Sequence, residues 1–190
     1  AITASFVEFI TNKLDDNLEL EIEYTIEHNN QEIPRAGGSE VGRIFEKSDI
    51  VTAYVNFIDE ICTYPINKLK VALDTANGAN FHLAPLVFDS LGIEYQVINN
   101  IPDGKNINKN CGSTHLEGLK ELIIKEKFDL GIAFDGDADR LLAVDEDGNE
   151  VNGDEIMFIC SRYLPRIKDN KVVVATIMSN LGFEIAIKKM

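Results

Sequence analysis

The sequence predicts an α/β protein with a mixed, mainly parallel sheet and helices on both faces of that sheet. Two observations support this fold class. From residue 69 onward, short apolar segments of the strand type alternate with longer segments of the helix type, and such alternation is typical of a parallel sheet covered by helices. The segments Lys70–Asp74 and Leu130–Phe134 also consist largely of apolar residues, as expected of strands buried on both faces.

The chain before residue 69 predicts two helices separated by a loop. The first helix covers Leu14–His28, an acidic segment whose apolar residues recur at every fourth position. Gln31–Gly42 contains a proline and several glycines and therefore predicts a loop. Ser48 and Asp49 can cap a second helix. We expect that helix to extend to about Cys62, because its apolar residues share one face.

The remaining segments predict the sheet and its helices. We expect strands at Lys70–Asp74, Tyr95–Ile98, Leu130–Phe134, Leu141–Asp145, Glu150–Val151 and Lys171–Thr176. We expect helices at Ala79–Leu91 with an interruption at Pro85, at His115–Lys127, from the cap residue Asp154 to about Tyr163, and from Ser179-Asn180 to the end. Ligands of such sheets bind beyond the carboxyl ends of the strands, where Asn77 and Asp135 lie.

The charge of the chain limits the partners that it can have. Its 190 residues include 32 acidic and 18 basic residues, for a formal net charge of −14. Nucleic acid and anionic membranes both require a basic surface, so we expect neither as a partner. The same charge repels anionic substrates, and a phosphorylated ligand would need a local cation, such as a metal ion or Arg140.

Cysteine content and hydropathy favour a cytoplasmic protein. Cys62, Cys111 and Cys160 are far apart, and the sequence contains no CxxC motif and no histidine at zinc spacing. Reduced thiols are the simplest interpretation. No apolar run approaches the roughly 18 residues of a membrane span, and no signal peptide is visible. Because the chain begins at Ala1 and ends in a predicted helix, we expect it to be a fragment.

The hexapeptide DGDADR at Asp135–Arg140 gives the strongest chemical signal. Asp135, Asp137 and Asp139 are spaced two residues apart and lie between two apolar runs. In an extended segment, side chains two apart point the same way, so the three carboxylates would converge. Carboxylates this close must take up protons or bind a cation. Because oxygen ligands suit Mg²⁺ before Ca²⁺, the sequence predicts a magnesium site.

Two other interpretations of this hexapeptide remain open. An acidic, solvated turn is common in a chain as acidic as this one. An EF-hand loop beginning at Asp135 would place Glu146 at its twelfth position. Its sixth position requires glycine, however, and here that position is Arg140. The apolar run that follows also resembles a strand, so the EF-hand interpretation is disfavoured.

Two polar segments carry weaker signals. The sequence DTANGA at Asp74–Ala79 is either a helix N-terminus offered to an anion or metal-bound group, or an ordinary strand-to-helix turn, which is favoured. The loop Asn99–Thr114 is unusually long and polar. After it, His115 could carry a proton, although a place in the first turn of a helix is more common. Cys111 has no identified base or cationic neighbour, so we expect no nucleophilic role.

Taken together, five motifs resemble those of the α-D-phosphohexomutase family. They are DTANGA at Asp74–Ala79, NINKNCGSTH at Asn106–His115, GIAFDGDADR at Gly131–Arg140, VDEDGNEVNGDEI at Val144–Ile156 and TIMSNLGFE at Thr176–Glu184. Their order and spacing match the family from about Leu18 to the end. The NINKNCGSTH run favours the branch of the family that acts on hexosamine phosphates.

This resemblance implies the roles of several residues. Asp135, Asp137 and Asp139 would bind Mg²⁺, and Arg140 would lie at the centre of phosphoryl transfer. Thr3-Ala4-Ser5 looks like the start of the family's phosphoserine segment, which makes Ser5 the implied phosphoserine. The His-Asn-Pro that follows this serine in the family is Phe6-Val7-Glu8 here, and the distance to the next helix is shorter than in the family.

The resemblance also implies a domain organisation and an activity. Family members have four domains around a cleft. Residues 1–49 would be the C-terminal part of the first domain, 50–168 the metal-binding α/β second domain, and 169–190 the start of the third. The parent enzyme would interconvert glucosamine 6-phosphate and glucosamine 1-phosphate through a phosphoserine and a bisphosphate intermediate. This segment alone would be inactive, because the family's substrate-phosphate loop would follow it.

Two alternative functions remain. The first is a sister mutase that acts on mannose or glucose phosphates. The second is a metal-binding module that does not catalyse a reaction. The departure from the family pattern after Ser5 would agree with this second alternative.

Overall fold

The computed structural model describes residues 14–28, 37–43, 49–62, 64–66, 68–164 and 172–190. The chain divides into two compact units, Ala1–Lys47 and Ser48–Met190. Ser5 and the apolar segment around it lie outside the described residues. Among the helices that are described, none is both long enough and apolar enough to cross a membrane.

In the first unit, the described residues form one helix and one 3₁₀ turn. The helix α2 spans Asp16–His28, which confirms the predicted helix, and the turn η1 spans Gly38–Glu40 within the predicted loop. No side chain of α2 is buried. Its apolar residues Leu18, Ile22 and Ile26 are 44%, 43% and 63% exposed. Their spacing therefore identified the helix correctly, but within the described part of this unit they cover no core.

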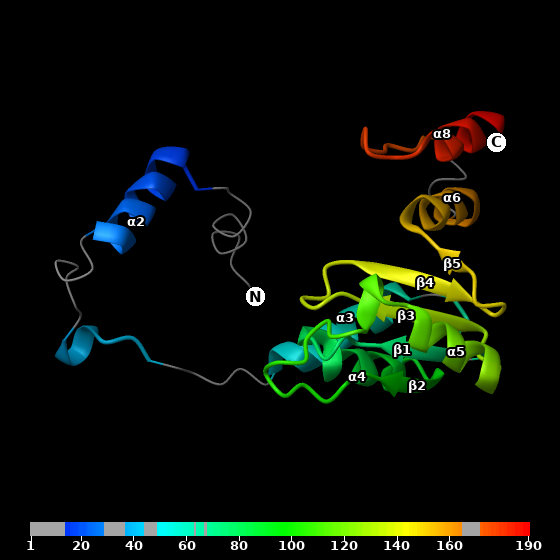
Figure 1. Cartoon of the computed structure of the whole chain (residues 1–190), viewed down its shortest axis with the longest axis horizontal. Coiled ribbons are helices and arrows are strands. Elements are labelled where there is room, and N and C mark those ends of the chain that lie inside the picture. Colours follow the sequence, from blue (N-terminus) through cyan, green and yellow to red (C-terminus); the bar gives the residue numbers. More distant parts are fainter. Residues whose placement is uncertain (1–13, 29–36, 44–48, 63, 67, 165–171) are drawn as a thin grey trace. The chain divides into compact units, whose positions relative to one another are not determined.

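The second unit is built on a five-stranded sheet with the order β2-β1-β3-β4-β5 (Figure 1). The strands are β1 (Lys70–Asp74), β2 (Glu94–Ile98), β3 (Leu130–Phe134), β4 (Leu141–Asp145) and β5 (Glu150–Val151). Strand β1 runs parallel to β2 and β3, whereas β4 runs antiparallel to β3 and β5. The predicted fold class is confirmed, and the parallel pairs are those that β1 forms.

Helices cover both faces of this sheet. Helix α4 (Leu83–Ser90) lies on one face and α5 (Glu117–Glu126) on the other. The buried core on the α4 face consists of Val71, Leu73, Ala84 and Ile93. The buried core on the α5 face consists of Ala72, Leu116, Leu119, Ile123, Phe128, Ala133 and Val144. Because successive side chains of a strand point to opposite faces, β1 contributes to both cores.

Three further helices complete the second unit. They are α3 (Asp49–Ile61), α6 (Gly153–Tyr163) and α8 (Leu181–Lys189). Helix α3 packs against α4, and the hydroxyl of Ser90 donates a hydrogen bond to the carboxylate of Asp59. Helix α6 packs against α8. The backbone N–H of Asn180, at the start of α8, lies 3.3 Å from each carboxylate oxygen of Asp154.

The break in the predicted helix 79–91 lies at His82, so the predicted interruption at Pro85 is wrong. A 3₁₀ turn, η2 (Ala79–Phe81), precedes α4, and His82 separates the two. Pro85 is instead the third residue of α4. Proline is tolerated there because the first N–H groups of a helix have no intrahelical acceptor.

The N-terminal cap of α6 is Asn152, so the predicted cap at Asp154 is also wrong. Asn152 Oδ1 accepts hydrogen bonds from the backbone N–H groups of Asp154 at 3.0 Å and Glu155 at 3.2 Å. The Glu155 carboxylate in turn accepts from the backbone N–H of Asn152 at 2.9 Å. This reciprocal pair is a capping box, which satisfies donors at both ends of the first turn.

The predicted strand Lys171–Thr176 does not form in the described residues. Lys171 lies outside them, and residues 172–176 adopt no strand conformation. Val174 is 90% exposed. A strand is stabilised by hydrogen bonds to a neighbouring strand, and no described strand pairs with this segment. The strand preference of its valines is therefore not sufficient by itself.

Candidate metal centre

The acidic loop is a tight connection between two antiparallel strands. Phe134, the last residue of β3, pairs with Leu141, the first residue of β4. The loop closes where the backbone N–H of Asp135 donates to the carbonyl of Arg140 at 3.2 Å and the N–H of Ala138 donates to the carbonyl of Asp135 at 3.2 Å. Ala138 adopts a left-handed φ of 62°. The chain therefore reverses direction within these six residues.

The three aspartates of this loop converge. Asp135, Asp137 and Asp139 each offer one carboxylate oxygen, and these oxygens lie within 4.8 Å of one another. Asp135 is buried, whereas Asp137 and Asp139 are exposed. The predicted origin of this convergence, an extended segment, is wrong, because a turn brings the three carboxylates together. Strand β4 occupies the second half of the supposed EF-hand loop, so the geometry also excludes that interpretation.

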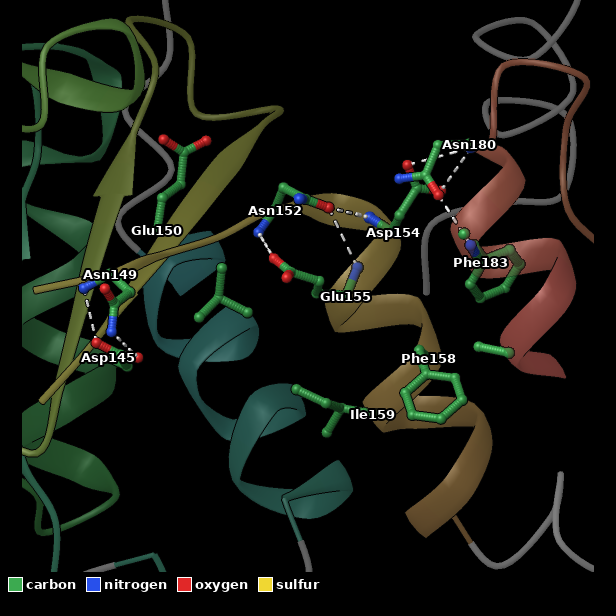
Figure 2. Close-up of a pocket in the computed structure, with 13 residues that line it drawn as sticks. Asp145, Asn149, Glu150, Asn152, Asp154, Glu155, Phe158, Ile159, Asn180 and Phe183 are labelled. Atoms are coloured by element: carbon green, nitrogen blue, oxygen red, sulfur yellow. Dashed lines mark hydrogen bonds between the residues drawn. The ribbon is translucent and has the colours of Figure 1, made fainter. Parts of the chain in front are cut away.

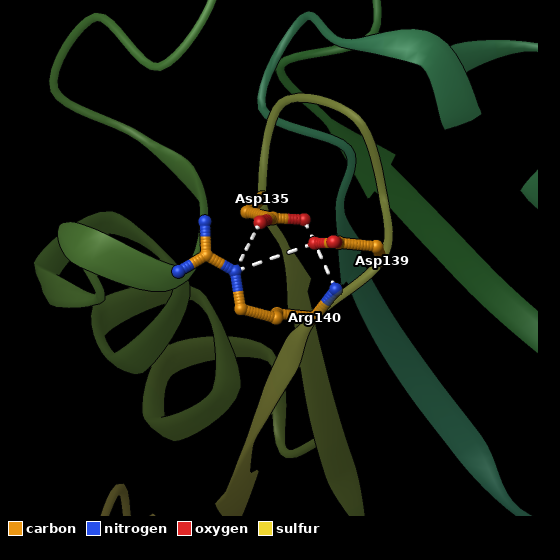
Figure 3. Close-up of polar contacts among 3 residues, drawn as sticks. All are labelled: Asp135, Asp139 and Arg140. Carbon is orange, nitrogen blue, oxygen red and sulfur yellow. Dashed lines mark hydrogen bonds and ion pairs between the residues drawn. The ribbon is translucent and has the colours of Figure 1, made fainter. Parts of the chain in front are cut away.

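Arg140 is held against the carboxylates by its side chain and its backbone. Its Nε donates to Asp135 Oδ2 at 2.8 Å and to Asp139 Oδ1 at 3.3 Å, and its backbone N–H donates to Asp135 Oδ1 at 3.2 Å. Figure 3 shows both terminal nitrogens of the guanidinium turned away from these carboxylates. Because the side chain is 79% exposed, these nitrogens can reach an anionic ligand in solution.

The charges of the loop shift the pKa values of its own groups in different directions. The carboxylate of Asp137, together with burial and the charge of Asp135, raises the pKa of Asp139. Burial alone would raise the pKa of Asp135, but hydrogen bonds from Arg140 outweigh burial and lower it. The same carboxylates raise the pKa of the Arg140 guanidinium. The single positive charge of Arg140 does not balance the three carboxylates of the loop. A divalent cation would relieve the repulsion that remains between them.

The loop opens into a pocket of about 630 Å³. The pocket is lined by Ile107, Asn108, Ser113, Thr114, Asp135, Gly136, Asp137, Arg140, Leu141, Leu142 and Gly153. The hydroxyls of Ser113 and Thr114 and the amide of Asn108 therefore share a cavity with the carboxylates and Arg140. These three residues belong to the NINKNCGSTH motif at Asn106–His115, but no individual role was predicted for them.

The DTANGA turn is an ordinary strand-to-helix connection. Ala76 and Asn77 adopt left-handed φ values of 55° and 47°. The backbone N–H groups of Ala76, Gly78 and Ala79 donate to Asp74 Oδ1, Thr75 O and Gly136 O, at 2.9, 2.8 and 2.8 Å. These donors are already occupied and cannot bind an anion as an open helix N-terminus would. The favoured interpretation of this motif is thus confirmed.

The other polar candidates, Cys111 and His115, do not line the pocket of the acidic loop. Cys111 is buried, and both burial and the nearby charge of Asp74 raise the pKa of its thiol. A raised pKa keeps the thiol protonated, in agreement with the expectation that it is not a nucleophile. His115 is exposed and lies just before Leu116, the N-cap of α5. It is therefore outside the helix, and its predicted place in the first helical turn is wrong.

A second pocket, of about 620 Å³, lies among the β4–β5 hairpin, α6 and α8 (Figure 2). Its lining contains the carboxylates of Asp145, Glu150, Asp154 and Glu155 and no basic side chain. An anionic ligand would be repelled there. The pocket that contains Arg140 is therefore the better candidate for a phosphorylated ligand.

Family models place the chain among known proteins. The model described as phosphoglucomutase/phosphomannomutase, alpha/beta/alpha domain II, matches residues 52–148, and the corresponding domain III model matches residues 152–190. The chain therefore belongs to the phosphoglucomutase/phosphomannomutase family. The domain III match begins within the range 50–168 that the sequence analysis assigned to the second domain.

Individual relatives agree with this assignment. The chain is 49% identical to the phosphoglucosamine mutases of Clostridium beijerinckii and Acetivibrio thermocellus, over 93% of this chain and 40% of each relative. A Burkholderia thailandensis protein of the phosphoglucomutase/phosphomannomutase family has a similar structure, with a TM-score of 0.62 and 26% identity over 81% of this chain and 32% of that one. The chain thus spans about 40% of the length of the curated relatives that it matches.

Proposed function

We propose that this chain is part of an enzyme that interconverts glucosamine 6-phosphate and glucosamine 1-phosphate. The relatives at 49% identity are phosphoglucosamine mutases, which favours a hexosamine phosphate over a mannose or glucose phosphate as the substrate. In this proposal residues 1–49, 50–168 and 169–190 belong to three successive domains, and the enzyme acts in the cytoplasm.

The observation that carries the proposal is the convergence of three carboxylate oxygens within 4.8 Å, one of them from a buried aspartate. Asp135, Asp137 and Asp139 would hold Mg²⁺, because hard oxygen ligands suit this ion and an open loop leaves positions for water or a phosphate oxygen. The carboxylate of Asp137 raises the pKa of Asp139, and this repulsion between the carboxylates supports a cation site. Bound Mg²⁺ would neutralise negative charge on the phosphoryl group that is transferred.

The remaining groups of the pocket would bind and orient the phosphate. The exposed terminal nitrogens of Arg140 would donate to a phosphate oxygen, while its Nε stays on Asp135 and keeps the guanidinium in place. Ser5, which lies outside the described residues, is the proposed phosphoserine. It would give its phosphoryl group to the sugar to form a bisphosphate, and then accept the other phosphoryl group back.

The proposal is tested with a full-length enzyme that contains these 190 residues. We expect it to convert glucosamine 6-phosphate faster than mannose 6-phosphate or glucose 6-phosphate. We expect Asp137→Ala to abolish turnover, whereas Asp147→Ala, which removes an exposed carboxylate from the turn at the other end of β4, should leave it unchanged. Normal turnover and Mg²⁺ dependence in Asp137→Ala would refute the metal assignment.

The non-catalytic alternative is tested by mass. An enzyme of the proposed mechanism carries a phosphate on Ser5 when isolated or after incubation with a hexose bisphosphate. A metal-binding module would carry none and would show no turnover of any of the three sugars.

A further inference from the structure

Asp74 is the least exposed carboxylate among the described residues. It ends β1 and is 1% exposed. Each of its oxygens accepts one backbone hydrogen bond, Oδ1 from Ala76 and Oδ2 from Gly112, both at 2.9 Å. Within the described part of the chain, no basic side chain forms an ion pair with it. Its two backbone hydrogen bonds therefore tie two separate segments of the chain to this one side chain.

The bond from Gly112 to Asp74 Oδ2 fixes the loop that carries Ser113. Gly112 lies 38 residues from Asp74 in sequence. Its φ is 73°, and a Cβ added to it would lie 2.6 Å from the carbonyl oxygen of Phe134. Phe134 directly precedes Asp135, the buried member of the acidic loop. By holding the N–H of Gly112, Asp74 therefore keeps this loop seated against the base of the acidic loop.

The bond from Ala76 to Asp74 Oδ1 fixes the turn that contacts the acidic loop. Asp74 Oδ1 holds the N–H of Ala76, whose carbonyl in turn accepts from Asn108 at 2.9 Å. At the end of the same turn, the N–H of Ala79 donates to the carbonyl of Gly136 at 2.8 Å. A Cβ on Gly78 would lie only 2.2 Å from that carbonyl oxygen, so the turn and the acidic loop are in direct backbone contact.

We propose that Asp74 is a positioning residue for the metal centre: its carboxylate couples the turn and the Ser113 loop, and these together hold the acidic loop in its cation-binding shape. The inference rests on the proposed metal role of Asp135, Asp137 and Asp139. A carboxylate is required because both of its oxygens face N–H donors. An asparagine would turn its amide N–H₂ toward one of them and lose that bond.

The test is a titration of the full-length enzyme that contains these 190 residues with Mn²⁺ as the probe, followed by electron paramagnetic resonance. We expect Asp74→Asn to weaken Mn²⁺ binding by roughly 10- to 100-fold, the effect typical of residues that orient metal ligands. Gly112→Ala should weaken it as well while leaving every charge in place. Asp129→Asn is the matched control, because Asp129 Oδ2 accepts the backbone N–H of Lys70 at the opposite end of β1, at 2.7 Å. The affinity of Asp129→Asn for Mn²⁺ should equal that of the wild type.

Amide hydrogen exchange without metal separates positioning from a general structural role. In Asp74→Asn, the N–H groups of Gly112 and Ala79 should exchange faster, while that of Ala72 in the middle of β1, like that of Leu73, should keep its wild-type rate. Wild-type Mn²⁺ affinity in Asp74→Asn, or faster exchange at Leu73 as well because the variant unfolds, would overturn the inference. The variant Asp137→Asn keeps the two failures apart. If Asp137→Asn binds Mn²⁺ like the wild type, the metal centre itself is refuted. If Asp137→Asn loses binding but Asp74→Asn keeps it, only the positioning role of Asp74 is refuted.

Discussion

At the scale of single residues, the shape of the acidic loop depends on Ala138 as much as on the aspartates. Ala138 adopts a φ of 62°, a conformation that costs an L-residue about 1 kcal/mol or more. It is this reversal that turns Asp137 and Asp139 toward Asp135. The carboxylates then repel one another, and the ion pair with Arg140 offsets only part of the repulsion. Strain and charge are thus concentrated in six residues.

A substitution series at Ala138 tests this dependence. We expect Ala138→Gly to keep or raise the affinity for Mn²⁺, because glycine adopts positive φ freely. Ala138→Val should lower the affinity by roughly tenfold, since a β-branched side chain is strongly disfavoured at positive φ. Both are measured by the same Mn²⁺ titration. Equal affinities in the two variants would show that the loop does not need this conformation to bind the ion.

At the scale of secondary structure elements, α5 contributes most to the core on its face of the sheet. Leu119 and Ile123 are fully buried, and they meet β3 at Gly131, where an added Cβ would lie 2.3 Å from Ile123 Cδ1. Glycine at this position therefore allows the helix to approach the strand that leads to Asp135. The packing of α5 thus fixes the position from which the acidic loop begins.

Truncations on α5 measure that packing. Leu119→Ala should lower the free energy of unfolding by about 2–5 kcal/mol, because it leaves a cavity in a closed core. Ile124→Ala on the same helix removes a side chain that is 59% exposed and should cost less than about 1 kcal/mol. Urea unfolding of both variants gives the comparison. A loss at Ile124 as large as that at Leu119 would contradict the assigned orientation of the helix.

The β4–β5 hairpin is stabilised by one carboxylate whose effect depends on pH. Asp145 Oδ1 accepts the backbone N–H groups of Asp147 and Asn149 at 3.0 and 2.7 Å, and its Oδ2 accepts from the Asn149 side chain at 3.0 Å. These bonds, above all those from Asn149, lower the pKa of Asp145. A carboxyl whose pKa is lowered in the folded state contributes stability above its unfolded pKa and loses it as the pH falls through the folded value.

The variant Asp145→Ala should therefore melt at a lower temperature than the wild type at neutral pH. The difference should shrink as the pH is lowered through the depressed pKa of Asp145, because the wild type then loses the same bonds. Thermal unfolding followed by circular dichroism at a series of pH values measures it. Asp147→Ala serves as the control, since the Asp147 side chain is not the acceptor in these bonds. A difference that does not depend on pH would contradict this account.

At the scale of the whole molecule, a net charge of −14 makes cations general stabilisers, so a specific site must be distinguished from screening. A ligand that binds only the folded state stabilises it by mass action, by about 2.7 kcal/mol at a concentration 100 times its Kd. Screening by salt depends on ionic strength and not on the identity of the ion. The two effects can therefore be separated experimentally.

We expect Mg²⁺ to raise the melting temperature of the chain more than NaCl at equal ionic strength. The excess should disappear in Asp137→Ala, which removes one of the proposed ligands, and persist in Asp147→Ala, which removes an equal charge elsewhere. Calorimetric scans at several Mg²⁺ concentrations provide the measurement. Equal shifts with the two salts in the wild-type chain would indicate screening without a specific site.

The sequence by itself determined the features that are encoded locally. Apolar spacing identified the helices α2 and α5, and short apolar runs identified the strands β1, β3 and β4, because both signals lie within the element itself. The spacing of the aspartates likewise identified the candidate ligands. The wrong cap of α6 was a local error, because Asn152 and Glu155 form a capping box within four consecutive residues. The wrong strand was a non-local error, because the valines near residue 174 have no described strand to pair with.

Only the tertiary structure decided how the candidate site is assembled. The sequence shows no link between Asp74 and Gly112, yet their hydrogen bond joins two loops 38 residues apart. Nor does it show that Ser113 and Thr114 share a pocket with the aspartates, or that a turn and not an extended segment brings the carboxylates together. The physical reason is that local patterns record which face of an element is apolar. Contacts between loops depend instead on how the sheet orders its strands, and that order is fixed only when the whole core packs.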